Sequence, residues 1–537
     1  MTTITIGLDG ANWDLIGDWL DAGRLPNLQR LIDDGIGGVS ESCLPPITVP
    51  NWKCYATGKN PGKLDVFRFD RIDTANREHV FHDAADFNSA ELWDYLNDEG
   101  LTAGVVNKPS TYPPKSIDGF VVAGGPDASD TTYRSIDSGF ATPPEVEEFL
   151  REELDYRVHP NPMISPTETG EAEVEAVLDL IDLRFEAADR LLEREDPDFL
   201  HLTVFYSMAL QHYFWDGEPV RRAWERIDEN LGRFLDEDHD ILVMSDHGTW
   251  HVDTVFYVNA WLAEQGYLET GGGVDELLGS VGVTKERALS ITKRLGITET
   301  LAKVVPERVQ RLVPWEEGVK RDRVLSVLDW EHTTAVASNQ GPIYLTLDRS
   351  DPRYEATRDE LIRKLEAVTH PETGERLVKS VHRGEAYYDG PYADRAPDLL
   401  LDQGRNVHVS DAVGPETPIA EEGVWAGGNM PEGIFLFSGP NFRSAGIRDR
   451  ASITDLAPTL LHAMGAAVPD DLDGEVLDVF EPGTDPAERA VEHRSPLPAP
   501  GAGAETDPAT DPPEGGADGG DEDGSVEQRL ADLGYLE

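Results

Sequence analysis

Short apolar runs alternate with longer polar and apolar stretches along the first half of the chain. Three runs are the clearest, at residues 4–8, 199–205 and 241–245. Apolar runs of this length, bounded by turn residues, are typical of strands buried on both faces of a sheet. Helices are predicted between them, at residues 25–34, 91–97, 143–155, 171–195 and 218–235. This alternation predicts an α/β fold with a mostly parallel sheet and helices on both faces.

Further along, the same criteria extend the pattern. Shorter strands are predicted at residues 104–107, 119–123, 342–347, 397–401 and 433–438. Helices are predicted at residues 353–367 and 452–464, and Gly465 is a natural C-cap for the second of them. We therefore expect residues 1–263 and 327–483 to form one core.

Three segments depart from this pattern. Residues 264–326 contain three consecutive glycines and several short helical stretches, and between Lys285 and Arg323 ten basic residues stand against six acidic ones. We expect a helical insertion there, acting either as a cap that steers an anionic substrate or as a packing appendage. Residues 484–525 are rich in Pro, Gly, Ala, Asp and Glu, a composition that predicts a disordered linker. Residues 526–537 are predicted to form a short helix.

The charge of the chain restricts its partners. Lys and Arg number 46 against 102 Asp and Glu, for a formal charge of −56, and only 11 of the 46 are lysines. This balance predicts a halophilic protein adapted to high salt, and it argues against nucleic acids and anionic membranes as partners. No apolar stretch approaches the ~20 residues of a membrane span, and no charged-then-apolar signal segment precedes residue 4. We expect a cytoplasmic protein; its oligomeric state stays open.

Candidate chemistry lies where the predicted strands end. Asp9 follows the first run, His212 follows the second, and Asp246 with His247 follows the third. In open α/β sheets ligands bind beyond the carboxyl ends of the strands. Carboxylates and imidazoles from separate strand ends suit Zn²⁺ or Mn²⁺.

A second candidate feature is the stretch 46–62, in which prolines and glycines flank one apolar segment. It is typical of a loop entering a helix, with Thr48 near the helix N-terminus, where an anion is favoured. Asn51 could add a side-chain N–H donor toward that anion. The alternative is a surface turn. The two cysteines that flank Thr48, Cys43 and Cys54, are expected to be small buried hydrophobes.

Ordered motifs over about residues 1–480 resemble the alkaline phosphatase superfamily, in particular its type I phosphodiesterase/nucleotide pyrophosphatase branch. The motifs are Asp9-Gly10, Thr48-Val49-Pro50-Asn51, Thr57-Gly58, Pro109–Pro114, Asn259–Leu262, Ser245-Asp246-His247-Gly248, Ala396–Leu399, Asp455–Leu461 and Pro469–Gly474. The resemblance implies a three-layer sandwich fold and a metal site at Asp9, Thr48, Asp246 and His247.

The same resemblance implies a second metal site that is incomplete here. The family pattern Asp-x-x-x-His falls on Met208 and His212, and a later His falls on Asn429, so that His212 alone remains. A thioether is a poor ligand for a hard dication. Lys53 or Lys108 is a candidate for a cationic side chain in the vacated position.

These features predict a metal-dependent hydrolase of small phosphate esters that acts through a covalent phospho-threonine at Thr48. Two other interpretations stay open at this point. One is a non-catalytic family member that binds a phosphate ester or a protein. The other is a sulfatase or a phosphomutase-like enzyme. The sulfatase pattern Cys/Ser-x-Pro-x-Arg is not met, because Trp52 stands where the arginine is required.

Overall fold

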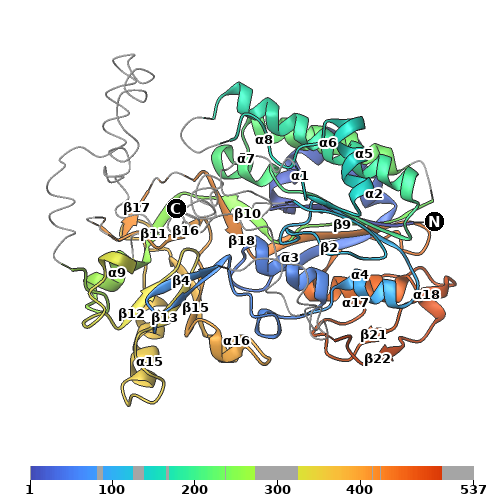
Figure 1. Ribbon diagram of the computed structural model, residues 1–537. Coiled ribbons are helices and arrows are strands. Elements are labelled where there is room, and N and C mark those ends of the chain that lie inside the picture. Colours follow the sequence, from blue (N-terminus) through green and yellow to red (C-terminus); the bar gives the residue numbers. More distant parts are fainter. Residues whose placement is uncertain are drawn as a thin grey trace, which may run out of the picture.

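A mixed sheet of nine strands lies at the centre of the molecule (Figure 1). The computed structural model describes residues 2–498, except 82–88, 125–137, 165–168, 236–237, 272–324 and positions 414, 416, 422 and 424. The strands follow the order β20 (Gly446–Ser452), β2 (Gly35–Glu41), β19 (Glu432–Ser438), β9 (Asp240–Met244), β1 (Thr3–Leu8), β8 (Phe199–Val204), β5 (Ala103–Val106), β6 (Gly119–Val122) and β7 (Ala141–Thr142).

The pairing in this sheet is mostly parallel, as the sequence pattern predicts. Strand β1 pairs in parallel with β8 on one side and β9 on the other. Antiparallel pairs occur where β19 lies between β2 and β9, and at the edge where β7 joins β6. Parallel neighbours end at the same edge of the sheet, so the carboxyl ends of β1, β8 and β9 lie together.

Helices cover both faces of the sheet, which confirms the α/β sandwich (Figure 1). On one face lie α1 (Trp13–Asp21), α2 (Pro26–Asp33), α5 (Pro144–Leu154), α6 (Glu171–Glu195), α7 (Ser207–Phe214) and α8 (Glu218–Leu231). On the other lie α3 (Thr48–Thr57), α4 (Leu92–Asp98) and α17 (Leu456–Ala463).

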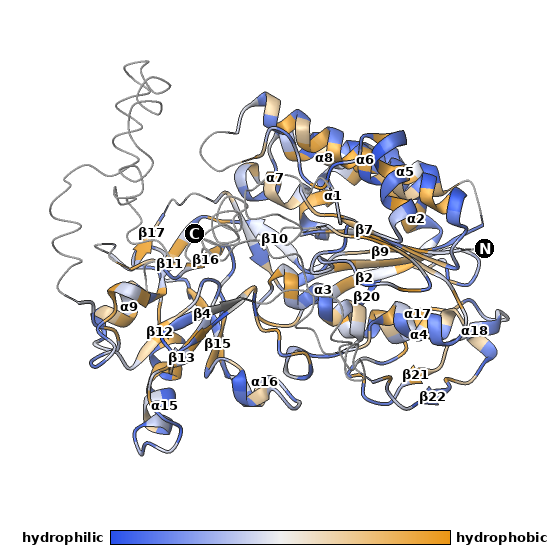
Figure 2. Cartoon of the chain, in the orientation of Figure 1, coloured by the Kyte–Doolittle hydropathy of each residue, from blue (hydrophilic) through white to orange (hydrophobic). Residues whose placement is uncertain are grey.

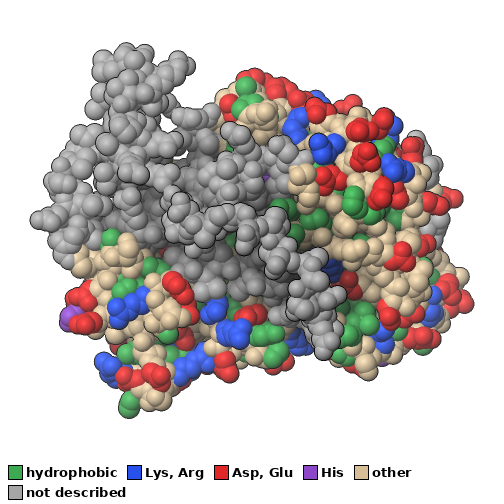
Figure 3. Space-filling model, in the orientation of Figure 1, with side chains coloured by type: hydrophobic (Ala, Val, Ile, Leu, Met, Phe, Trp, Pro, Cys, Tyr) green, Lys and Arg blue, Asp and Glu red, His purple; other side chains and the backbone are tan. Residues whose placement is uncertain are grey.

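The core forms because each element buries its apolar side. The apolar residues of β1 are fully buried, and α6 directs its stripe of apolar residues toward the sheet, as Figure 2 shows by colour. The outer surface of these helices is acidic with scattered arginines (Figure 3). Arg222 of α8, for example, pairs with Glu171 at 2.9 Å, and Arg233 pairs with Glu186 at 2.8 Å.

A second, smaller sheet has its own hydrophobic core. Its antiparallel strands follow the order β12 (Ala335–Ala337), β13 (Pro342–Leu345), β15 (Leu399–Gln403) and β14 (Val378–Arg383). Its core includes side chains of α9 (Val258–Glu264) and α15 (Tyr354–Leu365), and α16 (Gly384–Tyr387) follows β14. The region predicted as one core therefore holds two packed cores.

Small ribbons connect these two bodies. They are β3 (Asp70–Asp73) with β4 (Glu78–Phe81), β10 (Gly248–His251) with β18 (Gly427–Met430), and β11 (Thr254–Tyr257) between β16 (Val407–Ser410) and β17 (Ile419–Ala420). Short 3-10 turns cover Pro61–Lys63, Gly232–Phe234, Ala393–Arg395 and Ile453–Asp455.

The three segments that depart from the α/β pattern, residues 264–326, 484–525 and 526–537, lie only partly within the described residues. Most of the predicted insertion 264–326 lies outside the described residues, as does the helix predicted at 526–537. The expectation of disorder from residue 484 is wrong at its start. Helix α18 (Asp485–Glu488) and strand β22 (His493–Arg494) fold there, and β22 pairs with β21 (Val468–Pro469). Arg494 also pairs with Asp98 of α4, and Leu497 packs against the main hydrophobic core, so ion pairs and some apolar contact hold this segment.

Among the helices of the described ranges, none has the length and apolar character that crossing a membrane requires.

Candidate metal and phosphoryl site

The site is built at the carboxyl ends of two adjacent parallel strands. Asp9 follows β1, and Asp246 with His247 follows β9. The register pairs Gly7 with Met244, so the residues that come next emerge side by side. Gly10 makes the turn with a φ of +71°, and a Cβ there would lie 2.1 Å from Sδ of Met208. A glycine is therefore required to direct Asp9 into the site.

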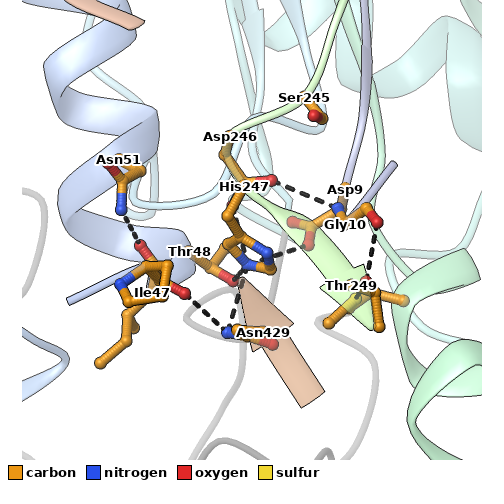
Figure 4. Close-up of polar contacts among 12 residues, drawn as sticks. Asp9, Gly10, Ile47, Thr48, Asn51, Ser245, Asp246, His247, Thr249 and Asn429 are labelled. Carbon is orange, nitrogen blue, oxygen red and sulfur yellow. Dashed lines mark hydrogen bonds and ion pairs between the residues drawn. The ribbon is translucent and has the colours of Figure 1, made fainter. Parts of the chain in front are cut away.

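Thr48 reaches the same place from a helix. It is the first residue of α3, and Gly58 ends that helix in the left-handed conformation with a φ of +66°. Thr48 Oγ1 lies 3.3 Å from Nε2 of His247 (Figure 4). The structure thus confirms that Thr48 lies at a helix N-terminus and rejects the alternative of a surface turn, since Thr48 is fully buried.

The hydrogen bonds of His247 define its ring. Nδ1 donates to the carbonyl of Gly248 at 3.0 Å, which leaves the lone pair of Nε2 for the site. Nε2 lies 3.3 Å from Asp246 Oδ2 and 3.8 Å from Asp9 Oδ1. Burial lowers the pKa of His247 to about 3, so the imidazole is neutral at ordinary pH.

These residues fit a divalent cation. Ligand atoms of Asp9, Asp246 and His247 all lie within 4.8 Å of one another, and all three side chains are fully buried. Burial raises the pKa of Asp9 to about 8 and holds that of Asp246 well above its ordinary value, with the charge of Asp9 adding to the effect. Two buried carboxylates at this distance need a compensating cation in order to ionise.

Asn51 has a different contact set from the one predicted. Its Nδ2 donates to the carbonyls of Pro45 and Ile47 at 3.2 and 3.0 Å, and its Oδ1 accepts from the N–H of Cys43 at 2.8 Å. The amide therefore fixes the loop before α3. Its predicted role as a donor to an anion is wrong in this arrangement, because the neighbouring carbonyls already use its N–H groups.

His212 lies apart from the Asp9, Asp246 and His247 group. It belongs to α7, its Nδ1 donates to the carbonyl of Gly427 at 2.7 Å, and its ring packs against Trp425. Met208, one turn earlier on α7, places Sδ 3.3 Å from Thr249 Oγ1 and covers Gly10. Apolar packing therefore occupies the place where the resemblance implies a carboxylate ligand.

Asn429 of β18 does reach the site. Its Nδ2 lies 3.4 Å from Nε2 of His247 and donates to the carbonyl of Pro46 at 2.8 Å (Figure 4). The position that the resemblance assigns to a histidine ligand is therefore next to Thr48, but it carries a neutral amide.

The two lysines considered as replacement cations are both paired with Glu91. Nζ of Lys53 lies 2.9 Å from Glu91 Oε1, Nζ of Lys108 lies 3.6 Å from the same oxygen, and Lys115 approaches Oε2 at 3.0 Å. Burial by itself would raise the pKa of Glu91, but the three lysines hold it well below its ordinary value. Lys53 and Lys108 thus form a buried charge cluster beneath α3 and α4.

Sequence reasoning missed several residues that support the site. Trp52 donates from Nε1 to Asp9 Oδ2 at 3.0 Å. Thr249 donates to the carbonyl of Gly10 at 2.7 Å, and Ser245 donates to that of Ala11 at 2.8 Å. For Trp52 a signal existed, because it stands four residues after Thr48 and so shares its helix face. The other two are visible only once the strands are paired.

The comparisons with known proteins identify a family. The family model described as type I phosphodiesterase / nucleotide pyrophosphatase matches residues 3–428. No curated protein matches the chain.

Two solved structures are similar to this chain. Phosphonoacetate hydrolase from Sinorhizobium meliloti, in complex with phosphonoformate, is 17% identical with a TM-score of 0.54, over 87% of this chain and 95% of that one. Murine ectonucleotide pyrophosphatase / phosphodiesterase 5 is 12% identical with a TM-score of 0.49, over 90% and 100%. The first likeness supports the fold. Because the family model matches most of its length, the chain belongs to the type I phosphodiesterase / nucleotide pyrophosphatase family, whose members are phosphoric ester hydrolases of the alkaline phosphatase superfamily.

Proposed function

We propose that this protein is a metal-dependent hydrolase of phosphate esters in which Thr48 is the nucleophile. One observation carries the proposal: Thr48 Oγ1, at the first residue of α3, lies 3.3 Å from Nε2 of His247. That nitrogen belongs to the group that fits a divalent cation. A hydroxyl in this position joins a nucleophile to a metal site and a helix N-terminus.

The metal ligands, Thr48 and the backbone N–H groups of α3 have different roles in the proposed reaction. A divalent cation held by Asp9, Asp246 and His247 would supply positive charge, which favours the alkoxide of Thr48 and stabilises charge on the phosphoryl oxygens. The hydroxyl of Thr48 loses its proton to water, and the alkoxide attacks phosphorus. The P–O bond to the leaving alcohol breaks, and the leaving oxygen takes the electron pair and a proton from water. The phosphoryl group stays on Thr48 as a covalent ester until water displaces it. The backbone N–H groups of Thr48 and Val49, in the first turn of α3, would bind the phosphoryl oxygens, because the first N–H groups of a helix have no partner within it.

We expect one strongly bound metal, Zn²⁺ or Mn²⁺. The ligands are two carboxylates and one imidazole, a set that both metals accept. Met208 and Asn429 stand where the resemblance implies further ligands. The thioether of Met208 is a poor ligand for a hard dication. The neutral amide of Asn429 supplies neither the imidazole of that pattern nor a negative charge. The proposed substrate is a small phosphate ester, since a charge of −56 disfavours polyanionic partners. A cytoplasmic location stays a prediction.

The test is turnover of a chromogenic phosphodiester in molar KCl, measured with the metal content of the same sample. Thr48→Ala should abolish turnover and leave the melting temperature within a few degrees of wild type. Thr57→Ala is the matched control: it removes a buried hydroxyl at the other end of α3, which donates to the carbonyl of Lys53, and it should keep turnover. Acid quenching followed by mass spectrometry should find the transferred group on Thr48. Thr48→Ala with near wild-type activity would exclude this residue as the nucleophile.

A further inference from the structure

A turn of the smaller sheet extends to the phosphoryl site. Residues 338–341 connect β12 to β13, and the turn is closed by a bond from the N–H of Ser338 to the carbonyl of Pro342 at 2.8 Å. Oε1 of Gln340 lies 3.4 Å from Nδ2 of Asn429, which itself lies 3.4 Å from Nε2 of His247. A continuous set of contacts therefore leads from Thr48 through His247 and Asn429 to this turn.

The backbone of the turn is held from both sides. The N–H of Asn339 donates to Asp411 Oδ2 at 3.0 Å, and its carbonyl accepts from the guanidinium of Arg68. The N–H of Gln340 donates to the carbonyl of Val409 at 2.9 Å, and Gln340 adopts a φ of +62°. A left-handed conformation at a residue other than glycine persists where its surroundings impose it. The side chains of this turn are thus carried by a fixed backbone.

The side-chain amides of Asn339 and Asn429 lack some of their hydrogen-bond partners among the described residues. Asn339 is fully buried, yet within the described part of the chain neither Nδ2 nor Oδ1 has a hydrogen-bond partner. Asn429 is 1% exposed, and its Oδ1 also has no partner among the described residues. Burying an amide without partners costs folding free energy, and native proteins pair nearly all such groups. A bound ligand that forms the missing hydrogen bonds would explain why these unpaired amides are buried.

We propose that Asn339, Gln340 and Asn429 form a subsite that binds the uncharged, hydrogen-bonding part of the substrate's second alcohol, the one that stays on the phosphoryl group when the first leaves. The inference rests on the proposed reaction at Thr48. A carboxamide offers one acceptor and two donors without charge, which matches sugar hydroxyls or the donor–acceptor edge of a nucleobase. A second anionic group would find these neutral amides a poor match. Asn339 and Asn429 are buried to nearly the same extent as Thr48.

The experiment compares three para-nitrophenyl diesters that share one leaving group. The second alcohol is thymidine (as its monophosphate), glycerol or a second nitrophenol. Asn339→Leu should lower kcat/KM about tenfold for the thymidine ester and leave that for the bis-aryl ester unchanged, because the lost bonds are to uncharged polar groups. If the glycerol ester also loses about tenfold, hydroxyls are bound; if it does not, the base edge is bound.

Stability separates a binding role from a structural one. Asn339→Leu removes two unpaired polar atoms, so the melting temperature should stay the same or rise. The control Asn97→Ala removes a fully partnered amide, which bonds to Leu101 and Asp118, and it should lower the melting temperature while leaving the ratio of the esters unchanged. If Asn339→Leu does not fold, Asn339→Asp keeps the side-chain volume and should still weaken the polar esters selectively.

Two outcomes overturn the subsite. One is an equal effect on all three esters, and the other is a lower melting temperature with unchanged selectivity, which would mean a structural amide or a bound water. Turnover of the bis-aryl ester by wild type would support the proposed reaction whether or not the subsite exists, so the two proposals can fail separately. If wild type hydrolyses none of the esters, calorimetry with thymidine monophosphate replaces kinetics. Binding about tenfold weaker to Asn339→Leu supports the subsite, and equal or absent binding rejects it.

Discussion

The indole Nε1 of Trp52 donates a hydrogen bond to Asp9 Oδ2 at 3.0 Å, and so joins the helix that carries Thr48 to a carboxylate of the metal site. Both side chains are fully buried. The bond leaves Asp9 Oδ1 directed toward His247 at 3.8 Å. Partners of this kind orient metal ligands and are part of a metal site in the same way as the ligands themselves.

Trp52→Phe should therefore weaken metal binding by about tenfold while preserving most of the packing. Chelator competition on the purified protein measures the metal dissociation constant directly. Trp224→Phe is the matched control, since Trp224 of α8 is equally buried and its Nε1 has no hydrogen-bond partner in the described ranges. Equal metal affinities of the two variants would show that the indole only fills space.

The charge cluster around Glu91 should be sensitive to loss of its single buried carboxylate. Glu91→Gln leaves Lys53 and Lys108 buried without their carboxylate, which typically costs about 3–5 kcal/mol of unfolding free energy. Urea denaturation at constant KCl gives the value. Glu186→Gln, in a partly exposed set of ion pairs with Arg190 and Arg233, should cost less than about 1 kcal/mol. A similar small cost for Glu91→Gln would show that the lysines lose their charge or find other partners.

The stability of the protein should fall in mild acid because of His201. Burial, together with the charge of Lys108, lowers the pKa of His201 to about 3, and Glu91 opposes this shift only in part. The folded state therefore binds this proton less readily than the unfolded state does. Its contribution is complete above the unfolded pKa of about 6.5 and is lost as pH falls toward about 3, at up to about 1.4 kcal/mol per pH unit.

His201→Gln should flatten this slope even if it lowers the absolute stability by disturbing Tyr55 and Thr203. Denaturation at a series of pH values between about 7 and 4 provides the comparison. His332→Gln is the control, because His332 is exposed and its hydrogen bond with Asp329 raises its pKa instead of lowering it. Parallel curves for wild type and His201→Gln would assign the acid sensitivity to other groups.

Rebuilding the missing ligands tests why only one metal is expected. Met208→Asp together with Asn429→His would surround the place of Met208 with an aspartate and two histidines, including His212, a set that Zn²⁺ accepts. The metal content, measured by elemental analysis, should then rise from one metal per chain toward two, and a simple diester should be hydrolysed faster. Each single variant should change little, because two ligands hold a dication poorly. Two metals already bound to wild type would contradict the assignment of Met208 and Asn429.

Dilution of salt should destabilise the fold. At about 0.1 M salt the Debye length is about 10 Å, whereas at 1 M it is about 3 Å. The excess carboxylates therefore repel one another in dilute buffer, and high salt screens this repulsion. Helix α6 contributes to this charge, with nine acidic residues against three arginines. Acidic side chains are also frequent over the helices at the top of Figure 3. Thermal unfolding across a KCl series should show a rising melting temperature. A constant value from about 0.1 M to about 3 M would reject the prediction of salt adaptation.

Local patterns in the sequence were sufficient to predict the α/β fold, the position of Thr48 and the grouping of Asp9 with Asp246 and His247. Burial on both faces gives a strand a continuous apolar run, and parallel strands end at one edge of the sheet. Helix α6 was predicted with its observed bounds because its apolar stripe follows helical spacing over 25 residues. Each of these inferences depends on neighbours along the chain.

Contacts between distant segments could be decided only by the tertiary structure. The side-chain amide of Asn51 binds the carbonyls of its own loop, a choice that depends on how residues 43–47 fold back on α3. The turn at Asn339 meets Asn429 because two sheets pack together, and no periodicity in either segment signals that contact. Residues 484–498 fold in spite of a composition typical of linkers, because Arg489 and Arg494 find partners on the core. A side chain's free energy depends on what surrounds it in space, and the order of residues alone does not contain those surroundings.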